Sequence, residues 1–220
     1  MEGWNKYKRG IFGYHCGTKL TLPDGTLVWL NAGSRITYSQ GFGVGNRKIE
    51  LIGEGYFEVK RNEEVPFLVK TNSLLVKVLG TKFNFRDYPD DAEAIVSLSE
   101  GKVALNNLLK KEKEAFLLPN ERVVLNKKNG RMHVEYSTVS NALQWTNGYL
   151  FFDEELLPDV VKELERSYNV KIQIASDTLN TFRFYGNFVH REQNIQEVLE
   201  ALSATRKIHY IIEGHNITLY

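Results

Sequence analysis

Apolar and polar residues alternate in short runs over the first two thirds of the chain, and turn-forming residues separate the runs. Leu20 to Ser34 (LTLPDGTLVWLNAGS) is the clearest example, with the turn Pro23-Asp24-Gly25-Thr26 between two apolar runs. Proline sets φ for the first turn position, aspartate can bond its own backbone, and glycine takes positive φ without a Cβ clash. The stretch therefore predicts two strands joined by a tight turn.

The same pattern recurs as far as Tyr136. Lys48–Lys60 reads as two strands around Gly53-Glu54-Gly55, Glu100-Gly101 reads as a hairpin turn, and Asn129-Gly130 is a strong two-residue hairpin signal. About five or six such units, spaced by roughly 20 residues, predict an all-β sandwich or a solenoid-like stack of strands.

Beyond this region the period of the apolar positions changes from two to near 3.6. One helical face holds Leu156, Leu157, Val160, Val161, Leu164 and Tyr168, and a second holds Ile195, Val198, Leu199 and Leu202. Asn194, with Glu197 three residues later, predicts the start of the second helix. Strands before and after each helix give the order βαβ followed by βαββ, an internal duplication.

The predicted fold class is mainly β plus α+β: an all-β stacked-strand domain, sandwich or solenoid-like, followed by a small duplicated βαβ–βαββ domain. We place the all-β domain at residues 1–136, with its core at 19–136. Residues 137–148 form a short helical connector, and residues 149–220 form the α+β domain.

Composition excludes few functions. The 28 basic and 27 acidic residues leave a net charge of +1, so nothing general attracts the chain to nucleic acid or to an anionic membrane. The single cysteine, Cys16, cannot form an intrachain disulfide. No segment approaches the ~20 apolar residues of a membrane helix.

Candidate chemistry is sparse. The glycines of Gly41–Gly45 precede a strand and not a helix, so they predict an inter-strand loop and no phosphate site. Asp153-Glu154-Glu155 is explained by a position at a helix N-terminus. The histidines are scattered, and His209 and His215 flank the last hairpin as exposed turn residues. We therefore expect no catalytic residue, no metal, no cofactor and no enzyme activity.

Two surfaces remain for binding. Edge strands of the small second-domain sheets can accept a partner strand, and we assign the contact to Phe182–Phe188 or to the terminal strand Asn216–Tyr220. The residues chosen for partner binding are Phe182, Phe184, Tyr185, Phe188, Ile217 and Leu219. An alternative is a carbohydrate-binding or cell-surface adhesion module that uses exposed aromatic residues, chosen from Phe12, Tyr14, Trp29, Tyr38, Phe42, Tyr56 and Tyr88. A jelly-roll enzyme with an unrecognised site is a further alternative.

The first domain resembles the FecR family of periplasmic sigma-factor regulators. The matching segments cover nearly all of 19–125 in the expected order; they read LPDGTLVWLNAGS, LIGEGYFEV, VPFLVKT, VLGTKFNF, SEGKVAL and LLPNERV. Asn120 stands where the family usually has glycine. The second domain is similar to the C-terminal domain that follows FecR, and through it to the short N-terminal domain of secretins and TonB-dependent receptors.

This resemblance implies a function. The chain would be the periplasmic part of a transmembrane anti-sigma factor, anchored in the inner membrane through an upstream helix that this sequence lacks. Its partner would be the periplasmic signalling domain of an outer-membrane TonB-dependent receptor. It would reach an extracytoplasmic-function sigma factor only through a cytoplasmic segment that is also absent here.

Overall fold

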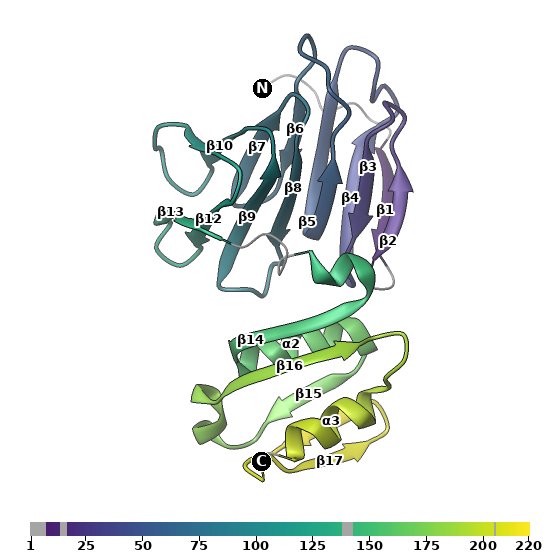
Figure 1. Ribbon diagram of the computed structural model, residues 1–220, viewed down its shortest axis with the longest axis vertical. Helices are drawn as coiled ribbons and strands as arrows, with labels where there is room; N and C mark the ends of the chain where they lie inside the picture. Colours follow the sequence, from purple (N-terminus) through teal and green to yellow (C-terminus); the bar gives the residue numbers. More distant parts are fainter. Residues whose placement is uncertain (1–7, 14–16, 138–142, 205) are drawn as a thin grey trace. The chain divides into compact units, whose positions relative to one another are not determined.

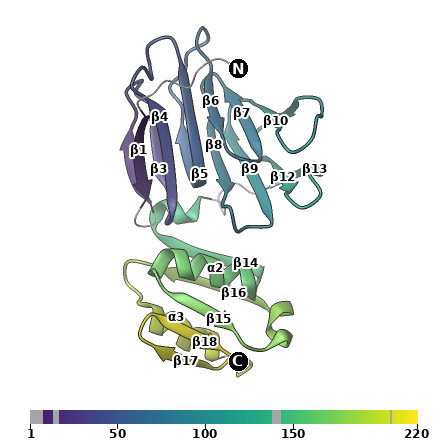
Figure 2. The ribbon, with the colours of Figure 1, turned by 180° about the vertical axis from the view of Figure 1, so that it is seen from behind.

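The computed structural model describes residues 8–13, 17–137, 143–204 and 206–220 (Figure 1). The chain divides into two compact units, Met1–Thr146 and Asn147–Tyr220. Within the described residues, no helix combines the length and the hydrophobicity needed to cross a membrane. Figure 2 shows the strands of the first unit and the helices of the second from behind.

The first unit is a sandwich of two sheets that share one long strand. In the first sheet the order is β1 (Lys8–Gly13), β4 (Ser34–Ser39), β5 (Arg47–Glu58), β6 (Phe67–Lys70), β7 (Leu74–Val78), β10 (Val103–Asn107) and β11 (Ala115–Leu117). In the second it is β2 (Thr18–Thr21), β3 (Leu27–Leu30), β5, β8 (Lys82–Asp87), β9 (Glu93–Glu100), β12 (Glu121–Asn126) and β13 (Met132–Tyr136). Only β5 and β6 run parallel among these pairs of described strands.

Strand β5 corrects one prediction. Lys48–Lys60 is not two strands around a turn, because Arg47–Glu58 runs as one strand through both sheets. Its first half pairs with β4 and β6, and its second half pairs with β3 and β8. The change occurs at Gly53, whose φ is +95°, a conformation that glycine adopts without strain. Glycine here bends a continuing strand instead of reversing it.

The connection at Glu100-Gly101 also differs from the prediction of a hairpin. Strand β9 pairs with β8 and β12, whereas β10 pairs with β7 and β11, so this turn passes from one sheet to the other. A hairpin joins β12 to β13 as predicted, but its turn is longer than the predicted two residues, because the Asn126 N–H donates to the Arg131 carbonyl and residues 127–130 form the loop. The Pro23–Thr26 turn joins β2 to β3. Because β5 pairs with strands from four separate parts of the chain, the domain is a sandwich and not a solenoid-like stack.

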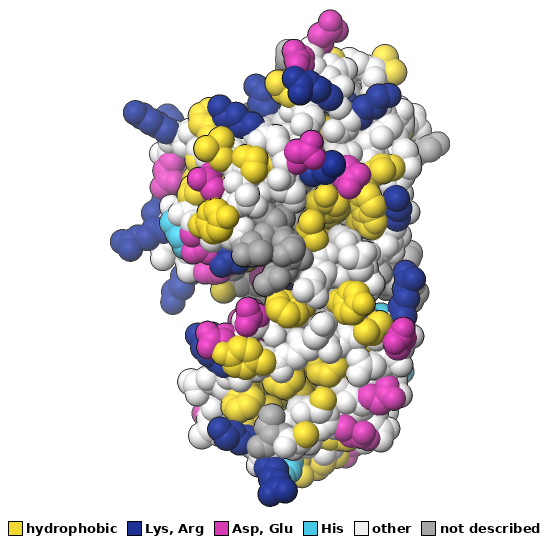
Figure 3. All heavy atoms as spheres, viewed as in Figure 1, with side chains coloured by type: hydrophobic (Ala, Val, Ile, Leu, Met, Phe, Trp, Pro, Cys, Tyr) yellow, Lys and Arg dark blue, Asp and Glu magenta, His cyan; other side chains and the backbone are white. Residues whose placement is uncertain are grey.

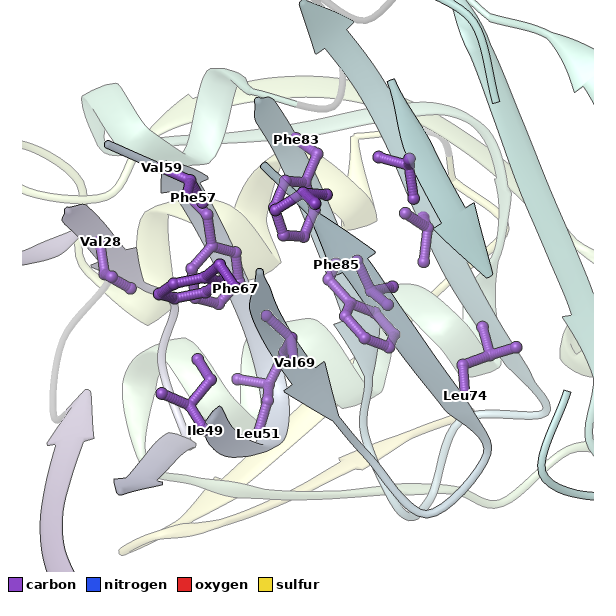
Figure 4. Close-up of a cluster of buried hydrophobic side chains, with 14 of the residues drawn as sticks. Val28, Ile49, Leu51, Phe57, Val59, Phe67, Val69, Leu74, Phe83 and Phe85 are labelled. Carbon is purple, nitrogen blue, oxygen red and sulfur yellow. The ribbon is translucent and has the colours of Figure 1, made fainter. Parts of the chain in front are cut away.

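The core lies between the sheets and is rich in phenylalanine. Phe57 and Phe83 stack with ring centroids 5.0 Å apart, and Phe67 lies 6.3 Å from Phe57 (Figure 4). All three side chains and that of Phe85 are completely buried. Alternating positions on both sheets supply the rest of the core, which explains the period of two in the sequence.

The second unit has the predicted βαβ–βαββ order. Its elements are β14 (Tyr149–Leu156), α2 (Leu157–Tyr168), β15 (Lys171–Ile174), the 3₁₀ turn η2 (Asp177–Thr181), β16 (Arg183–Val189), α3 (Ile195–Ser203), β17 (Tyr210–Glu213) and β18 (Asn216–Leu219). Strand β14 pairs antiparallel with β16. A second sheet has the order β15-β18-β17, in which β15 and β18 are parallel and β17 and β18 form a hairpin.

The helix signals are confirmed, with one error. Pro158 lies in the first turn of α2, and Asn194 and Glu197 form a complete capping box at α3. The acidic run Asp153–Glu155 does not lie at a helix N-terminus as predicted. It belongs to β14, where a β-bulge lies between Phe152 and Glu155 and Glu154 has φ +56°.

The connector is described in part. A 3₁₀ turn, η1 (Gln144–Asn147), lies in the predicted helical stretch, and residues 138–142 lie outside the described residues. Trp145 is buried against Tyr56, beside the half-buried Trp29 and Leu143. The rings of Trp29 and Tyr56 are 5.4 Å apart. This end of the connector is therefore fixed to the outer face of the second sheet of the first unit.

Candidate functional site

The six residues predicted to bind a partner divide into core and surface. Phe184, Phe188, Ile217 and Leu219 are buried, with at most 6% of each exposed. Phe182 is half-buried, and Lys207 Nζ lies 5.7 Å from the centre of its ring. Only Tyr185 is well exposed, at 59%. Four of the six side chains therefore pack in the core and are not exposed for contact with a partner.

One of the two predicted edges is not an edge. Strand β18 lies between β15 and β17, so its backbone groups are bonded on both sides, and the prediction that the terminal strand accepts a partner strand is wrong. A lone hairpin signal at the end of the sequence cannot reveal that an earlier strand, β15, pairs in parallel on the other side. Strand β16 pairs with β14 and with no other described strand.

The open side of β16 follows from its register. The Gly148 carbonyl accepts a bond from His190, and the Phe182 carbonyl accepts one from Leu157. In an antiparallel pair the residues that bond to the partner strand alternate with residues whose N–H and C=O point away from it. The alternation from these two ends turns the backbone groups of Arg183, Tyr185 and Asn187 to the open side.

The far end of this edge is already occupied. The Val189 N–H donates to Oε1 of Gln193, and the Val189 carbonyl accepts from the Glu192 and Gln193 N–H groups. We name the remaining open stretch, Arg183–Asn187 of β16, the β16 edge. It is long enough for a short extended segment of a partner to add as a third strand.

Aromatic side chains lie on the outer face beside the β16 edge. Tyr149 is 38% exposed and Phe151 is half-buried on β14, and both alternate with the buried Leu150 and Phe152. Figure 3 shows hydrophobic side chains gathered over β14 and β16 in the second unit. Together with Tyr185 they add apolar contact area to a backbone edge, the combination that strand-addition sites use.

The β-bulge holds Tyr185 in place. The Tyr185 hydroxyl donates to the Glu154 carboxylate, and Nη1 of Arg183 donates to the Glu154 carbonyl at 2.6 Å. The hydrogen bond to Glu154 raises the pKa of Tyr185 above its ordinary value. The acidic run that the sequence assigned to a helix therefore positions an exposed aromatic residue.

Gly186 has a packing role within the same strand. A Cβ at this position would lie 2.6 Å from the ring of Phe184 and 2.8 Å from the ring of Phe188. These two rings stack in parallel planes, with centroids 6.2 Å apart, on the buried face. The sequence Phe-Tyr-Gly-Asn-Phe thus places its two phenylalanines inward and Tyr185 and Asn187 outward.

The first unit buries a polar cluster centred on Glu54. Its carboxylate accepts from Nδ2 of Asn84 at 2.7 Å and Nδ2 of Asn31 at 2.9 Å, with Nη1 of Arg86 at 3.5 Å. Glu54 therefore ties together β5, β8 and the residue that follows β3. The Glu54 carboxylate already accepts hydrogen bonds from these donors, so we assign the glutamate of the Gly53-Glu54-Gly55 motif a structural role.

A small surface hollow is lined by Asn72, Ser73, Asp87 and Lys127, together with Leu51, Ile52 and Pro89. Nζ of Lys127 lies 2.7 Å from Oδ1 of Asp87 and also donates to the Tyr88 carbonyl. The ion pair uses both charged groups within the fold. We therefore assign the hollow no ligand.

Gly41–Gly45 lies between the paired strands β4 and β5, as an inter-strand loop. His209 faces Tyr220 and not His215 across the last hairpin. In the described part of the chain, no three His, Cys, Asp or Glu side chains are grouped to hold a metal ion.

The glycan-binding alternative loses most of its residues. Tyr38, Phe42, Tyr56 and Tyr88 are at most 8% exposed, and Trp29 is half-buried. Tyr14 and Cys16 lie outside the described residues, and the position of the Phe12 side chain is not described. The described aromatic residues among those named for the alternative are therefore mostly core residues.

Comparisons with known proteins agree with this architecture. The FecR protein family model matches residues 15–104, and the model of the FecR C-terminal domain matches residues 149–219. A crystal structure of a protein described as an anti-sigma factor from Parabacteroides distasonis ATCC 8503, at 1.65 Å resolution, is 34% identical. It has a TM-score of 0.85, and the match covers 96% of this chain and 98% of that one. A second structure of that description, at 2.50 Å, is 33% identical over 97% and 99% of the two chains, also with a TM-score of 0.85. No curated protein matches significantly.

Fold and comparisons together define the class, a two-unit regulatory protein related to anti-sigma factors. The chain belongs to the FecR family. Both the family and the structural neighbours indicate a regulatory role.

Proposed function

We propose that this chain is the periplasmic signal-receiving region of a FecR-like transmembrane anti-sigma factor. It receives a signal from the periplasmic signalling domain of an outer-membrane TonB-dependent receptor. It passes the signal through an inner-membrane helix to a cytoplasmic segment that binds an extracytoplasmic-function sigma factor. Membership of the FecR family and similarity to a protein described as an anti-sigma factor support the proposal.

The β16 edge is the observation that carries the receptor-binding part. Its backbone donors and acceptors at Arg183, Tyr185 and Asn187 face away from β14, and exposed aromatic side chains lie beside them. An extended segment of the receptor domain would add to this edge, with main-chain hydrogen bonds for affinity and the aromatic face for specificity. The boundaries expected from the sequence, a connector at residues 137–148 and a second domain at residues 149–220, stay a prediction. We propose that residues 149–220 are the receptor-binding part.

Docking would act by mass action. A receptor domain that binds one state of the second unit shifts the chain toward that state by its difference in affinity. Trp145 packs on Tyr56 within the first unit and lies directly before the second unit in the chain, so we propose that the shift reaches the first unit along the connector. No turnover is required of the chain.

Calorimetry with the signalling domain of a receptor encoded beside this protein tests the proposal. We expect saturable heat with the wild-type chain. Asn187→Pro removes an N–H that points to the open side, so binding should weaken while the pairing of β14 and β16 persists. Tyr185→Ala should also weaken binding, and Tyr136→Ala, at a residue 79% exposed in the first unit, is the matched control.

Two results would count against the proposal in different ways. If no heat appears with the cognate domain at high micromolar concentration, the receptor is not the partner. Binding that survives both β16 substitutions, in variants whose thermal unfolding is normal, would leave the receptor as partner and place the contact on another surface.

A further inference from the structure

The last hairpin leaves a second open edge, separate from the β16 edge. Strand β17 pairs with β18 and with no other described strand, and it is the outermost strand of its sheet (Figures 1 and 2). Ile211 is 50% exposed and Ile212 is 41% exposed. Edge strands commonly carry lysine, proline or a bulge that prevents pairing with another chain, and Tyr210–Glu213 carries none of these.

The register determines which groups of β17 are open. His209 and Tyr220 exchange two backbone bonds, at 2.9 and 3.0 Å, so they form a hydrogen-bonded pair. By alternation, Ile211 and Glu213 also bond toward β18, and Tyr210 and Ile212 turn their N–H and C=O to the open side. An approaching strand therefore meets two donors and two acceptors in a regular row.

The side chains of β17 divide between the two faces of the sheet. Tyr210 and Ile212 lie opposite the buried Leu219 and Ile217, so they belong to the inner face. His209, Ile211 and Glu213 belong to the outer face and are exposed. On the outer face the apolar Ile211 therefore lies between His209, whose imidazole can donate a hydrogen bond, and Glu213, whose carboxylate can accept one.

We propose that β17 pairs with β17 of a second copy of this chain, antiparallel and around a two-fold axis at Ile211. In this register Tyr210 lies opposite Ile212 of the second copy, and these are the residues whose backbone groups are open. Ile211 lies opposite its own counterpart. His209 lies opposite Glu213 of the second copy, where the imidazole N–H can donate to the carboxylate.

The register satisfies three conditions together. Backbone donors meet acceptors, apolar side chains meet apolar side chains, and each Glu213 meets a histidine and not another carboxylate. A shift of the axis to Ile212 moves Glu213 away from His209 and opposite Ile211. The two three-stranded sheets would join as β15-β18-β17 followed by β17-β18-β15 of the second copy. The inference concerns a different strand from the one assigned to the receptor and does not depend on that assignment.

The contact is short, so we expect a weak dimer. An interface below about 1,200 Å² is typical of transient association, and we expect a dissociation constant on the order of 100 µM. Sedimentation velocity of the 220-residue chain from about 10 µM to about 1 mM should show a reversible monomer–dimer equilibrium. A chain that stays monomeric throughout this range overturns the proposal.

Substitutions test the register. Ile211→Lys should raise the dissociation constant about tenfold or more, because two lysines then face each other at the axis. Glu213→Arg removes the favourable pair with His209 and should weaken the dimer. The double variant His209→Glu/Glu213→Arg restores opposite charges in the proposed register and should recover the dimer, which a merely structural role for Glu213 would not predict.

The control is Tyr136→Lys, an exposed position in the first unit, which should dimerise like the wild-type chain. If the double variant stays as weak as Glu213→Arg, the register around Ile211 is wrong. If Ile211→Lys dimerises normally, the contact uses another surface. Loss of receptor binding in Ile211→Lys, with a monomeric wild type, would identify β17 as a receptor edge and overturn self-pairing.

Discussion

Nη1 of Arg47 lies 3.3 Å from Oδ2 of Asp24, and this buried pair links the first hairpin turn to the strand that both sheets share. Arg47 also donates to three backbone carbonyls, those of Lys60 at 2.7 Å, Val65 at 2.8 Å and Asn62 at 3.2 Å. Asp24 in turn accepts from the Thr26 N–H at 2.9 Å. One guanidinium therefore holds the turn and the loop after β5 in place.

Arg47→Met should destabilise the first unit strongly. The substitution leaves a buried carboxylate and three carbonyls without their donor, and such a loss costs about 3–5 kcal/mol. Arg47→Lys should fall between wild type and Arg47→Met, because an ammonium cannot reproduce the planar set of donors. The measurement is the free energy of unfolding in urea.

Arg61→Met is the matched control. The Arg61 side chain is 78% exposed and pairs with a Glu63 side chain that is 66% exposed, so the change should cost less than about 1 kcal/mol. Equal losses for the two methionine variants would show that Arg47 does not hold these segments.

Gly53→Ala should be severely destabilising. The new Cβ would lie 2.5 Å from Oγ of Ser34 and 2.9 Å from its Cα, at a φ of +95°. Gly45→Ala separates the cost of positive φ from the cost of the close contact, since Gly45 has φ +75° and nothing lies within 4 Å of its Cβ position. We expect a loss of about 1–2 kcal/mol for Gly45→Ala from the backbone alone. Thermal unfolding should show a clearly larger loss for Gly53→Ala, and similar losses would contradict the close contact.

Glu54→Gln should cost about 1–3 kcal/mol of unfolding free energy. Asn31 and Asn84 donate to different oxygens of Glu54, so the NH₂ group of the glutamine replaces one acceptor and faces the side-chain NH₂ of either Asn31 or Asn84. Urea unfolding measures the loss, and Glu63→Gln at an exposed site is the control. A neutral result would mean that the cluster rearranges without cost.

The raised pKa of Tyr56 predicts that the first unit loses folding stability at alkaline pH. Burial, and then the nearby Glu58 carboxylate, raise the pKa of Tyr56 above the unfolded value of 10.0. A raised pKa means that the folded state keeps its proton more tightly, so this stability is complete below pH 10 and is lost as the pH rises through the folded pKa. Urea unfolding between about pH 8 and pH 11 should show a shallower decline for Tyr56→Phe than for wild type. An identical decline would exclude Tyr56 as a cause.

Local sequence signals predicted the turns and helices of this fold better than they predicted which strands pair with each other. The turn at Pro23–Thr26 and the capping box at Asn194 were predictable because their chemistry is contained within a few residues. Gly53 was misread because positive φ serves both a reversal and a bend, and only the pairing of β5 with distant strands decides between them.

The candidate site was predictable only in part, for the same reason. The alternation in β16 located an edge strand, but aromatic residues chosen for their size proved mostly to be core, as Phe184 and Phe188 are. The open edge of β17 was missed, although the run from His209 to Glu213 carries its own signal: apolar residues with no lysine or proline among them. Which strand covers which edge depends on the parallel pair β15–β18, whose partners are far apart in the sequence.

The sharing of β5 by both sheets has a consequence for how the first unit comes apart. Removing the whole of Arg47–Glu58 from the fold takes a pairing partner from β3, β4, β6 and β8 at once. Neither sheet can then melt while the other survives, so a pulling force or a protease that frees β5 should release the whole unit in a single step. Such a unit is either intact or fully open, and a gradual response to load is not available to it.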